Sequence, residues 1–395
     1  MSDPRTLGPL SPDPPSPAPL SLYIHVPFCA SRCGYCDFNT YTATELGDNV
    51  HRDTFHEYLI AEIRAAAEQL SEGGIVQTVF VGGGTPTLLG SPALNQLLIA
   101  VRDNFALAPD AEITTEANPD SVDPPMLEQL RDGGFTRISF GMQSSAPHVL
   151  ATLERTHTSG ASSAAALAAA AAGFDHVNLD LIYGTPGETD EDLHRSLDEV
   201  LAADVDHVSA YSLIVEPGTA LARRVQRGEV PTPDDDVAAD RYELIDRRLG
   251  EAGFDWYEVS NWSTPGGECR HNIAYWRNSS WWGIGPGAHS HLEGRRWWNV
   301  KHPHTYAQRV SEGLSPMHDE EILTPAQREL ETLMLGLRMR QGVPRSTIAC
   351  EDRVIGELES GGLLDPDALH SETPTLVLTP AGRLLADHVI RTLAA

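Results

Sequence analysis

Basic residues are scarce in this chain, and lysine is nearly absent. Of the 28 basic residues only Lys301 is a lysine, whereas 56 residues are acidic, so the formal net charge is −28. A protein that binds a nucleic-acid backbone or an anionic membrane surface needs a positive face. The charge balance therefore argues against both as the main partner.

Long apolar runs and a disulfide framework are also missing. No stretch of about 18 apolar residues occurs, so no transmembrane segment is predicted. The chain has five cysteines, and three of them lie close together, a pattern that does not suit a disulfide-stabilised domain. Clustered thiols fit a reducing compartment, and we expect a cytoplasmic protein.

The N-terminus has no apolar segment of the kind that a signal peptide contains. Residues 1–20 include seven prolines together with several serines. This composition is typical of a disordered tail.

What the chain does contain is a regular alternation of apolar strands and amphipathic helices. Strands are expected near 21–27, 76–81, 111–116, 137–143, 177–183 and 207–215, with helices between them. Mostly apolar strands that alternate with helices predict a parallel sheet covered by helices. Such sheets carry their chemistry at the carboxyl ends of the strands.

The alternation stops near residue 220. We expect an α/β unit over 21–220 and an aromatic-rich α/β extension over 221–322, which holds all seven tryptophans. A small module over 323–395, with two or three helices and a short strand, has the pattern of a winged helix. This module has more acidic than basic residues, so it is not expected to bind DNA.

Three cysteines follow the first predicted strand with the spacing C-x3-C-x2-C. Cys29, Cys33 and Cys36 can ligate a metal or a cluster with little loss of loop entropy. A [4Fe–4S] cluster held by three cysteines keeps one iron open to a small molecule. A zinc site is the alternative, but it needs four ligands, and Cys269 and Cys350 stand alone and far away. The spacing favours the cluster.

Polar residues and glycines follow the other strands. The run Gly82-Gly83-Gly84-Thr85-Pro86 lacks Cβ atoms at three positions, so it can bring backbone close to a ligand or simply make a tight turn. Glu116, Gln143, Arg155 and Asp180 lie on or just after strand ends. Such residues are often helix caps or ion pairs. If they lie together at the carboxyl-end rim of the sheet, they would suit a zwitterionic ligand. The carboxylates could bind an amine or hydroxyl groups, and the arginine could bind a carboxylate.

A second cluster, rich in aromatic residues, histidine and glycine, runs from His271 to His289. Aromatic planes, glycine turns and imidazoles can line a flat ligand such as a porphyrin, with histidine as an axial iron ligand. Alternatively the tryptophans pack a layer of the core and the glycines mark hairpin turns. Composition alone favours this second interpretation.

Together these motifs resemble the radical S-adenosylmethionine (SAM) superfamily, in particular its oxygen-independent coproporphyrinogen III oxidase-like branch. The likeness is carried by residues 23–29, 82–87, 116–119, 139–144 and 180–184, and it extends over most of residues 20–390. It implies an α/β fold with a partial (β/α)6 TIM-like barrel, a C-terminal α+β extension and a small winged-helix-like module.

Two features separate the groups within this branch. The oxidases carry a further cysteine two residues after the third, where this chain has Phe38, and they have an N-terminal extension that contacts the substrate. The motif H-N-x-x-Y-W at 271–276 is similar to the signature of the HemW family of heme chaperones.

The resemblance therefore implies a cytoplasmic protein, able to visit the membrane, that binds heme, a [4Fe–4S] cluster and SAM. Such a protein would hand heme to an acceptor protein. One alternative is an oxygen-independent coproporphyrinogen III oxidase of porphyrin biosynthesis. Another is a radical SAM enzyme that acts on a different small molecule.

The family's functional positions map onto this chain residue by residue. Cys29, Cys33 and Cys36 match the cluster ligands, and His271 matches the proposed heme-binding element. The SAM-contacting positions are matched by Tyr23, Tyr35, Gly83, Gly84, Thr85, Glu116, Gln143, Arg155 and Asp180. No catalytic residue is assigned.

Overall fold

The computed structural model describes residues 19–46, 50–70, 74–156, 158 and 160–394. The disordered tail expected over 1–20 therefore lies outside the described residues, apart from its last two positions.

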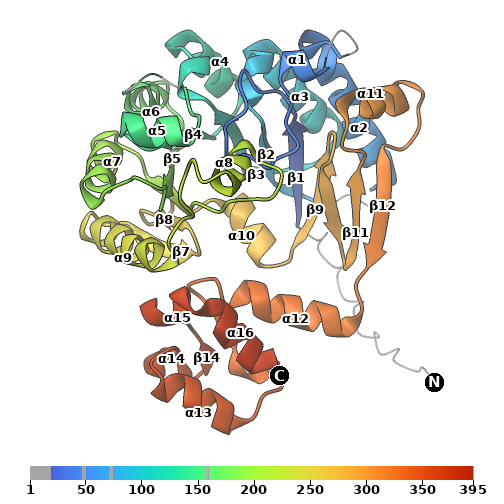
Figure 1. Ribbon diagram of the computed structural model, residues 1–395. Coiled ribbons are helices and arrows are strands. Elements are labelled where there is room, and N and C mark those ends of the chain that lie inside the picture. The colour runs from blue at the N-terminus through green and yellow to red at the C-terminus, as the bar shows by residue number, and fades with distance from the viewer. Residues whose placement is uncertain (1–18, 47–49, 71–73, 157, 159, 395) are drawn as a thin grey trace, which may run out of the picture.

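Six parallel strands form the centre of a twelve-stranded sheet (Figure 1). They are β1 (Leu20–Val26), β2 (Val76–Gly83), β3 (Leu107–Ala117), β4 (Arg137–Gln143), β5 (His176–Tyr183) and β6 (His207–Ser212). Each strand pairs in parallel with the next along the chain. The expected partial (β/α)6 arrangement is confirmed, although β3 begins earlier and β6 ends earlier than the sequence predicted.

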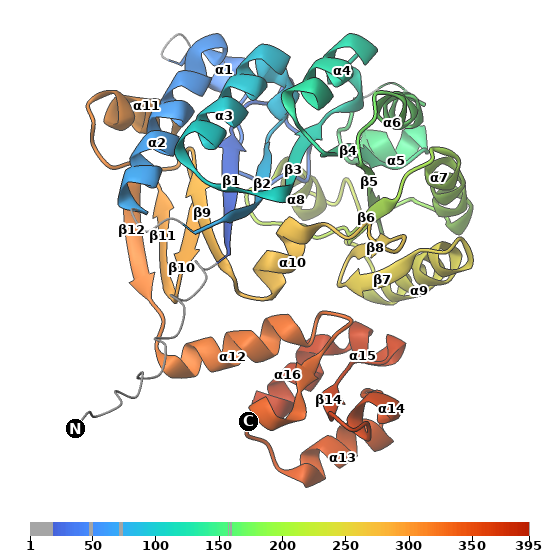
Figure 2. The same ribbon diagram turned by 180° about the vertical axis from the view of Figure 1, so that it is seen from behind.

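Helices connect these strands and cover the outer face of the sheet (Figures 1 and 2). They are α1 (Ala43–Leu46), α2 (Phe55–Gln69), α3 (Ser91–Asn104), α4 (Pro124–Gly133), α5 (Pro147–Thr152), α6 (Ala161–Ala171), α7 (Asp190–Ala202) and α9 (Asp235–Glu251). The short helix α8 (Ala220–Gln226) lies on the opposite side of the strands from α2 and α3, next to the loop after β1. Several begin at a capped residue; at α7 the Thr189 side chain and Asp192 form a capping box. Among the described residues, no helix is long and apolar enough to cross a membrane.

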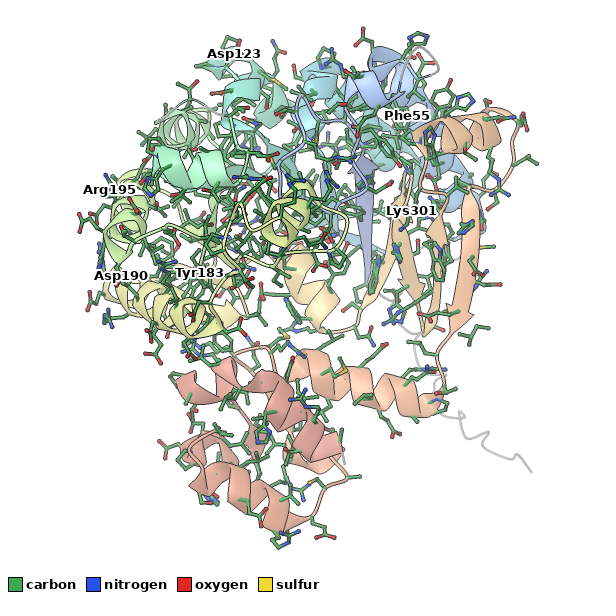
Figure 3. The ribbon with its side chains drawn as sticks, viewed as in Figure 1. Phe55, Asp123, Tyr183, Asp190, Arg195 and Lys301 are labelled. Carbon is green, nitrogen blue, oxygen red and sulfur yellow. The ribbon has the colours of Figure 1, made fainter. Side chains whose placement is uncertain are left out.

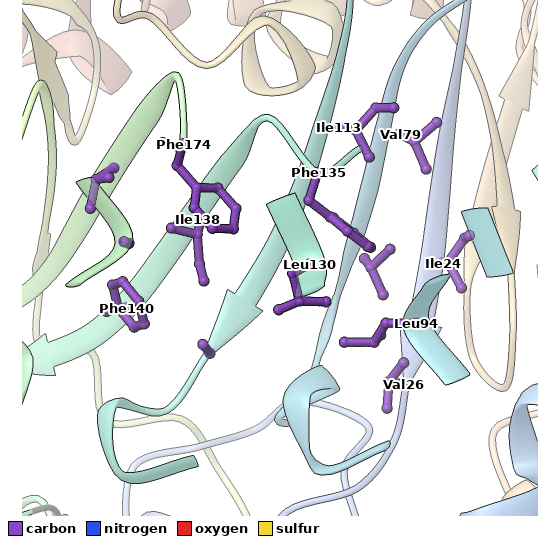
Figure 4. Packing of buried hydrophobic residues seen from close by; sticks show 14 of the residues in the cluster. Ile24, Val26, Val79, Leu94, Ile113, Leu130, Phe135, Ile138, Phe140 and Phe174 are labelled. Carbon is purple, nitrogen blue, oxygen red and sulfur yellow. The ribbon is translucent and has the colours of Figure 1, made fainter. Parts of the chain in front are cut away.

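Side chains alternate between the two faces of the six strands, as the pleat requires. Ile24, Val79 and Ile138 point to the helix side, where they pack in one cluster with Leu94 and Phe135 (Figure 4). The residues between them face the interior of the barrel, and most of these are polar. The apolar core therefore lies between the strands and the helices, and the barrel interior offers mostly polar side chains to a ligand.

The aromatic-rich extension supplies both edges of the sheet. On one edge β9 (Ser280–Ile284) pairs in parallel with β1, and three antiparallel strands follow: β10 (His289–Leu292), β11 (Arg295–Asn299) and β12 (Met317–Ile322). On the other edge are β8 (Asn261–Ser263) and β7 (Asp255–Glu258). The extension also contains α10 (Arg270–Trp276) and α11 (Pro303–Ser311).

The C-terminal module lies beneath the barrel in Figure 1 and has an apolar cluster of its own. It consists of α12 (Pro325–Gly336), β13 (Val343–Pro344), α13 (Asp352–Ser360), α14 (Pro366–Leu369), β14 (Thr375–Leu376), α15 (Pro380–Leu384) and α16 (Ala386–Ala394). It has more helices than the two or three expected, because several are a single turn or two long and leave little periodicity to read.

Candidate functional site

The three clustered cysteines lie in the loop after β1. Their thiols are half-buried and line one cavity of about 150 Å³. The loop is tied to distant parts of the chain: the Gly34 N–H donates to the Leu153 carbonyl (3.0 Å), and the Leu221 N–H donates to the Gly34 carbonyl (2.8 Å). The predicted ligands are thus brought together at the carboxyl ends of the strands.

The cysteines do not form the compact group that a single metal ion requires. In the segments that the structure describes, no three His, Cys, Asp or Glu side chains converge in that way. Burial raises the pKa of Cys29 to about 11, partly offset by a hydrogen bond with Thr40. Any metal centre bound here must therefore displace protons from the thiols.

The glycine run after β2 packs directly against the cysteine loop. A Cβ atom on Gly84 would lie 2.3 Å from the Phe28 carbonyl oxygen and 3.0 Å from Cys29 Sγ. The Gly84 N–H donates to the Val26 carbonyl (2.8 Å), and the Thr85 N–H donates to the Phe28 carbonyl (2.7 Å). These glycines are required for a close approach of two backbones, and the N–H groups of Gly84 and Thr85 are already used in that contact.

Two half-buried carboxylates, Glu116 and Asp180, line the same cavity. Burial raises the pKa of Glu116 to about 8, with a further contribution from the negative charge of Asp180. Burial also raises the pKa of Asp180, against hydrogen bonds from Asn178, Ser209 and Ser139. A ligand that brings a cation or several hydroxyl groups would relieve the unfavourable burial of these carboxylates.

Gln143 and Arg155 complete the rim, and both hold polar atoms without a partner. Gln143 has a φ of 68°, a left-handed conformation rare for a residue other than glycine and often found at functional sites. The Arg155 guanidinium donates to the Gly141 carbonyl (2.8 Å) and lies 3.4 Å from Cys33 Sγ. Gln143 Oε1 and Arg155 Nε are buried and unpartnered. Buried polar atoms of this kind normally mark the place of a ligand or a water.

The two predicted tyrosines have different positions. Tyr35 lines the cysteine cavity, as expected for a ligand contact. Tyr23 lines neither this cavity nor the larger one described next, and its hydroxyl lies 2.9 Å from His25 Nδ1. His25 Nε2 in turn lies 2.9 Å from the carbonyl oxygen of Asn39 in the cysteine loop. In this structure Tyr23 supports the loop through His25.

A larger cavity of about 420 Å³ continues from the cysteines into the barrel interior. Its deeper walls carry a series of buried polar residues that the sequence analysis did not single out: Thr114, Arg137, Ser139, Asn178, His207 and Ser209. They occupy every second position of β3 to β6. The alternation of polar and apolar residues along these strands could have identified them from the sequence, because every second side chain of a strand lies on the same face.

Helix α10, which carries the H-N-x-x-Y-W motif, lies at the amino ends of the strands in both views (Figures 1 and 2). The N–H groups of Arg270 and His271 donate to the Glu112 carboxylate (3.1 and 3.0 Å), and Glu112 forms a buried ion pair with Arg137 (3.1 Å). The helix therefore closes the floor of the barrel, with a carboxylate at its N-terminus.

His271 itself is fully enclosed in this floor. Its Nδ1 lies 2.8 Å from Thr78 Oγ1 and its Nε2 lies 2.9 Å from the Tyr275 hydroxyl. The side chain is 1% exposed, and it lines neither of the two cavities described above. The structure thus separates His271 from the cysteines and from solvent.

The tryptophans and glycines of the second cluster serve mainly in packing. Trp262, Trp282 and Trp297 belong to the main apolar cluster, and the last two meet edge to face. A Cβ atom on Gly285 would lie 2.5 Å from the His25 carbonyl oxygen. For these residues the structure supports the core interpretation over a porphyrin-lining one.

Comparison with known proteins places the chain among characterised relatives. A family model described as the Radical SAM superfamily matches residues 23–200. The heme chaperone HemW of Mycobacterium tuberculosis (strain ATCC 25618 / H37Rv) is 56% identical over 376 residues, which cover 95% of each chain. The heme chaperone HemW of Synechocystis sp. is 39% identical over 82% of this chain and 79% of the relative.

A solved structure is similar along nearly the whole chain. The coproporphyrinogen III oxidase (HemN) from Escherichia coli, described as a radical SAM enzyme, matches with a TM-score of 0.81 and covers 96% of this chain and 91% of the other. The sequence identity is 24%, so this likeness establishes the fold and nothing about the reaction.

Proposed function

Because the chain belongs to the HemW family of heme chaperones, within the radical SAM superfamily, we propose that it binds heme and passes it to an acceptor protein in the cytoplasm. The observation that carries this proposal is the 56% identity over 95% of both chains. That likeness extends through the extension and the C-terminal module, which the superfamily match over 23–200 does not reach.

The cysteine cavity fits a [4Fe–4S] cluster and SAM as resident cofactors. We propose that Cys29, Cys33 and Cys36 hold the cluster and that the rim holds SAM. When bound, this pair supplies electron transfer and radical chemistry. The unpartnered atoms of Gln143 and Arg155 support such a ligand, because they offer one acceptor and one donor without a partner in the protein.

The rim residues can orient a zwitterion through their charges. Arg155 places a buried positive charge beside Cys33, where it can receive a carboxylate. Glu116 and Asp180 offer oxygen atoms to an amine or to hydroxyl groups. The proposed SAM contacts of Gly83, Gly84, Thr85, Tyr23 and Tyr35 come from the family resemblance, and of these Tyr23 would act indirectly.

The resemblance also makes His271 a proposed heme ligand, and the structure defines what that role would require. Both ring nitrogens are engaged inside the barrel floor. Burial lowers the pKa of His271 to about 4, so the ring is neutral and able to coordinate iron. Ligation would nevertheless require α10 to release the side chain.

No contact in the described residues specifically favours the alternative function, an oxygen-independent coproporphyrinogen III oxidase. Phe38 is 63% exposed at the cavity mouth, in the position where the oxidases carry a further cysteine. The fold similarity to HemN is shared by both groups of the branch, so it does not separate them.

Full-length protein with an anaerobically reconstituted cluster would test the proposal. We expect a saturable heme absorption band with a Kd in about the micromolar range or tighter. We also expect no conversion of coproporphyrinogen III to protoporphyrinogen IX with SAM and a reductant. Absence of heme binding by cluster-loaded protein would refute the chaperone, and conversion at catalytic rates would favour the oxidase.

A further inference from the structure

A cleft of about 460 Å³ separates the edge of the barrel from the C-terminal module. Its barrel wall includes Tyr183, Tyr211 and Trp256, and its module wall includes Arg338, Arg383 and Leu384. The module lies below α9 and β7 in both views, and Tyr183 is labelled on the adjacent side of the barrel (Figures 1, 2 and 3). Neither wall belongs to the cysteine site.

Apolar side chains are unusually exposed around this cleft. Ile214 is 65% exposed, Tyr211 is 42% exposed, and Val259 and Leu384 are each 37% exposed. Contiguous apolar surface of this kind commonly marks a binding site. Tyr211 and Ile214 also line the barrel cavity, so the cleft continues from the mouth beside the cysteines.

The inner part of the cleft is aromatic, and its two arginines are paired with carboxylates. Arg383 forms an ion pair with Asp246 (2.7 Å), and Asp235 and Asp387 also line the cleft. The Arg383 guanidinium stacks over the Trp256 ring at 4.4 Å from its centroid, and Trp256 Nε1 is buried without a partner.

Arg338, with a side chain 20% exposed, donates to the Met334 carbonyl (2.6 Å) and forms an ion pair with Asp387, whose side chain is 72% exposed. A ligand carboxylate can replace Asp387 at little cost, because an exposed ion pair contributes little stability.

We propose that this cleft is the heme site of the protein. The macrocycle lies against Trp256 and Tyr211 on the barrel side and Leu384 on the module side, with a propionate on Arg338. This inference rests on the proposed heme-chaperone function and specifies where that function is carried out. A flat apolar ring with carboxylates at one edge matches the apolar walls and Arg338, whose carboxylate partner is exposed.

The residues that line the cleft include no histidine, cysteine or methionine. The three phenols among them belong to Tyr183, Tyr211 and Tyr242. Tyr183 and Tyr242 are buried, and the Tyr211 hydroxyl lies beside Ser209 and Asp180 in the barrel interior, where burial raises its pKa far above the usual value. The proposed site therefore binds heme through the macrocycle and a propionate.

An outer site also suits delivery better than the barrel floor. Heme that must pass to another protein has to lie where that protein can reach it. The cleft is open at the surface, whereas His271 is 1% exposed and doubly hydrogen-bonded. Heme can therefore bind and leave the cleft while α10 stays closed.

Heme titrations of the full-length, cluster-loaded protein test this site with Ile214→Asp, Leu384→Asp and Arg338→Gln. Each substituted side chain lies at the surface of the cleft, so the variants are expected to fold, which circular dichroism checks. Leu314→Asp and Arg353→Gln are matched controls on exposed residues outside the cleft. We expect about tenfold or greater loss of affinity in the two Asp variants, a smaller loss in Arg338→Gln, and control values within about twofold of wild type.

Distinct results separate failure of the site from failure of the function. Wild-type affinity in both Asp variants, together with loss of heme binding in a folded His271→Ala variant, would overturn the cleft and leave the chaperone function in place. No heme binding by the unaltered protein would overturn both.

Discussion

At the scale of single residues, the site is defined by groups that are unfavourable in isolation. Glu116 is a half-buried carboxyl group whose pKa is raised by burial and by the charge of Asp180, and Gln143 has a left-handed backbone. Arg155 and Gln143 each retain a buried atom without a partner. Proteins keep such features where ligand binding compensates for them. These unfavourable features therefore mark the ligand site more clearly than the residue types of its sequence motifs do.

Glu116 should make the ligand-free protein less stable as the pH rises. The carboxyl group ionises near pH 4.5 in the unfolded chain but only near pH 8 when folded, so between these values the folded state binds more protons. The free energy of unfolding must then fall as the pH increases from about 4.5 to 8. We expect Glu116→Gln to flatten this slope and to stabilise the protein by about 1–3 kcal/mol at pH 8.

Urea unfolding at several pH values would measure this effect, with the exposed Glu68→Gln as a control. A wild-type slope in Glu116→Gln would contradict the prediction. The same substitution should weaken SAM binding, since it removes one of the two carboxylates on the rim.

At the scale of elements, α10 functions as the closure of the barrel. Its N-terminal N–H groups bind Glu112, and its histidine joins β2 through Thr78. The H-N-x-x-Y-W motif thus has a structural role whether or not it also contacts heme. A loss of heme binding in a variant of this motif can therefore come from a disturbed barrel floor as well as from a lost heme contact.

His271→Ala should lower the free energy of unfolding by about 2–4 kcal/mol, because it leaves a cavity in the barrel floor and removes hydrogen bonds to Thr78 and Tyr275. Exposed His289→Ala should change it by less than about 0.5 kcal/mol. Chemical denaturation of both variants would measure the difference. Equal stability of His271→Ala and wild type would show that the floor does not depend on this side chain.

At the scale of the whole molecule, ion pairs and hydrogen bonds join the C-terminal module to the rest of the chain, among them the ion pairs Arg340–Asp255 (2.9 Å) and Arg296–Glu331 (2.6 Å). Arg383 from α15 forms an ion pair with Asp246 of α9 (2.7 Å) and stacks on Trp256 of β7. An isolated β-bridge links Glu258 with Met339. Because the module has its own apolar cluster, we propose that 323–395 is a separate unit whose docking position depends in part on Arg383.

Arg383→Ala should loosen this docking without unfolding the barrel. The pair is only partly buried, so we expect a loss of about 1–2 kcal/mol, to which the lost stacking on Trp256 contributes. Hydrogen exchange should rise in α15, α16 and β7 and stay unchanged in β1 to β4. A uniform rise across the whole chain would argue instead for global destabilisation.

Much of the architecture was readable from the sequence. The six strands, their helices and the carboxyl-end position of Cys29, Glu116, Gln143 and Asp180 follow from hydrophobic period and residue spacing, which are local properties of the chain. The family could be read for the same reason, since its motifs are short and contiguous. The polar inner face of β3 to β6 was also encoded locally, in every second residue, but it was read as part of a mostly apolar strand.

Only the tertiary structure decided which of these residues meet. His271 and Cys29 belong to equally distinctive motifs, yet one is enclosed in the barrel floor and the other lines the cavity at the opposite end of the strands. Tyr23 proved to support the cysteine loop through His25. The cleft joins residues of β5 to β7 with α15 and α16, more than a hundred positions apart. Its walls meet only when the module docks on the barrel. The cleft could not be predicted from the sequence, because no local pattern records the packing of one unit on another.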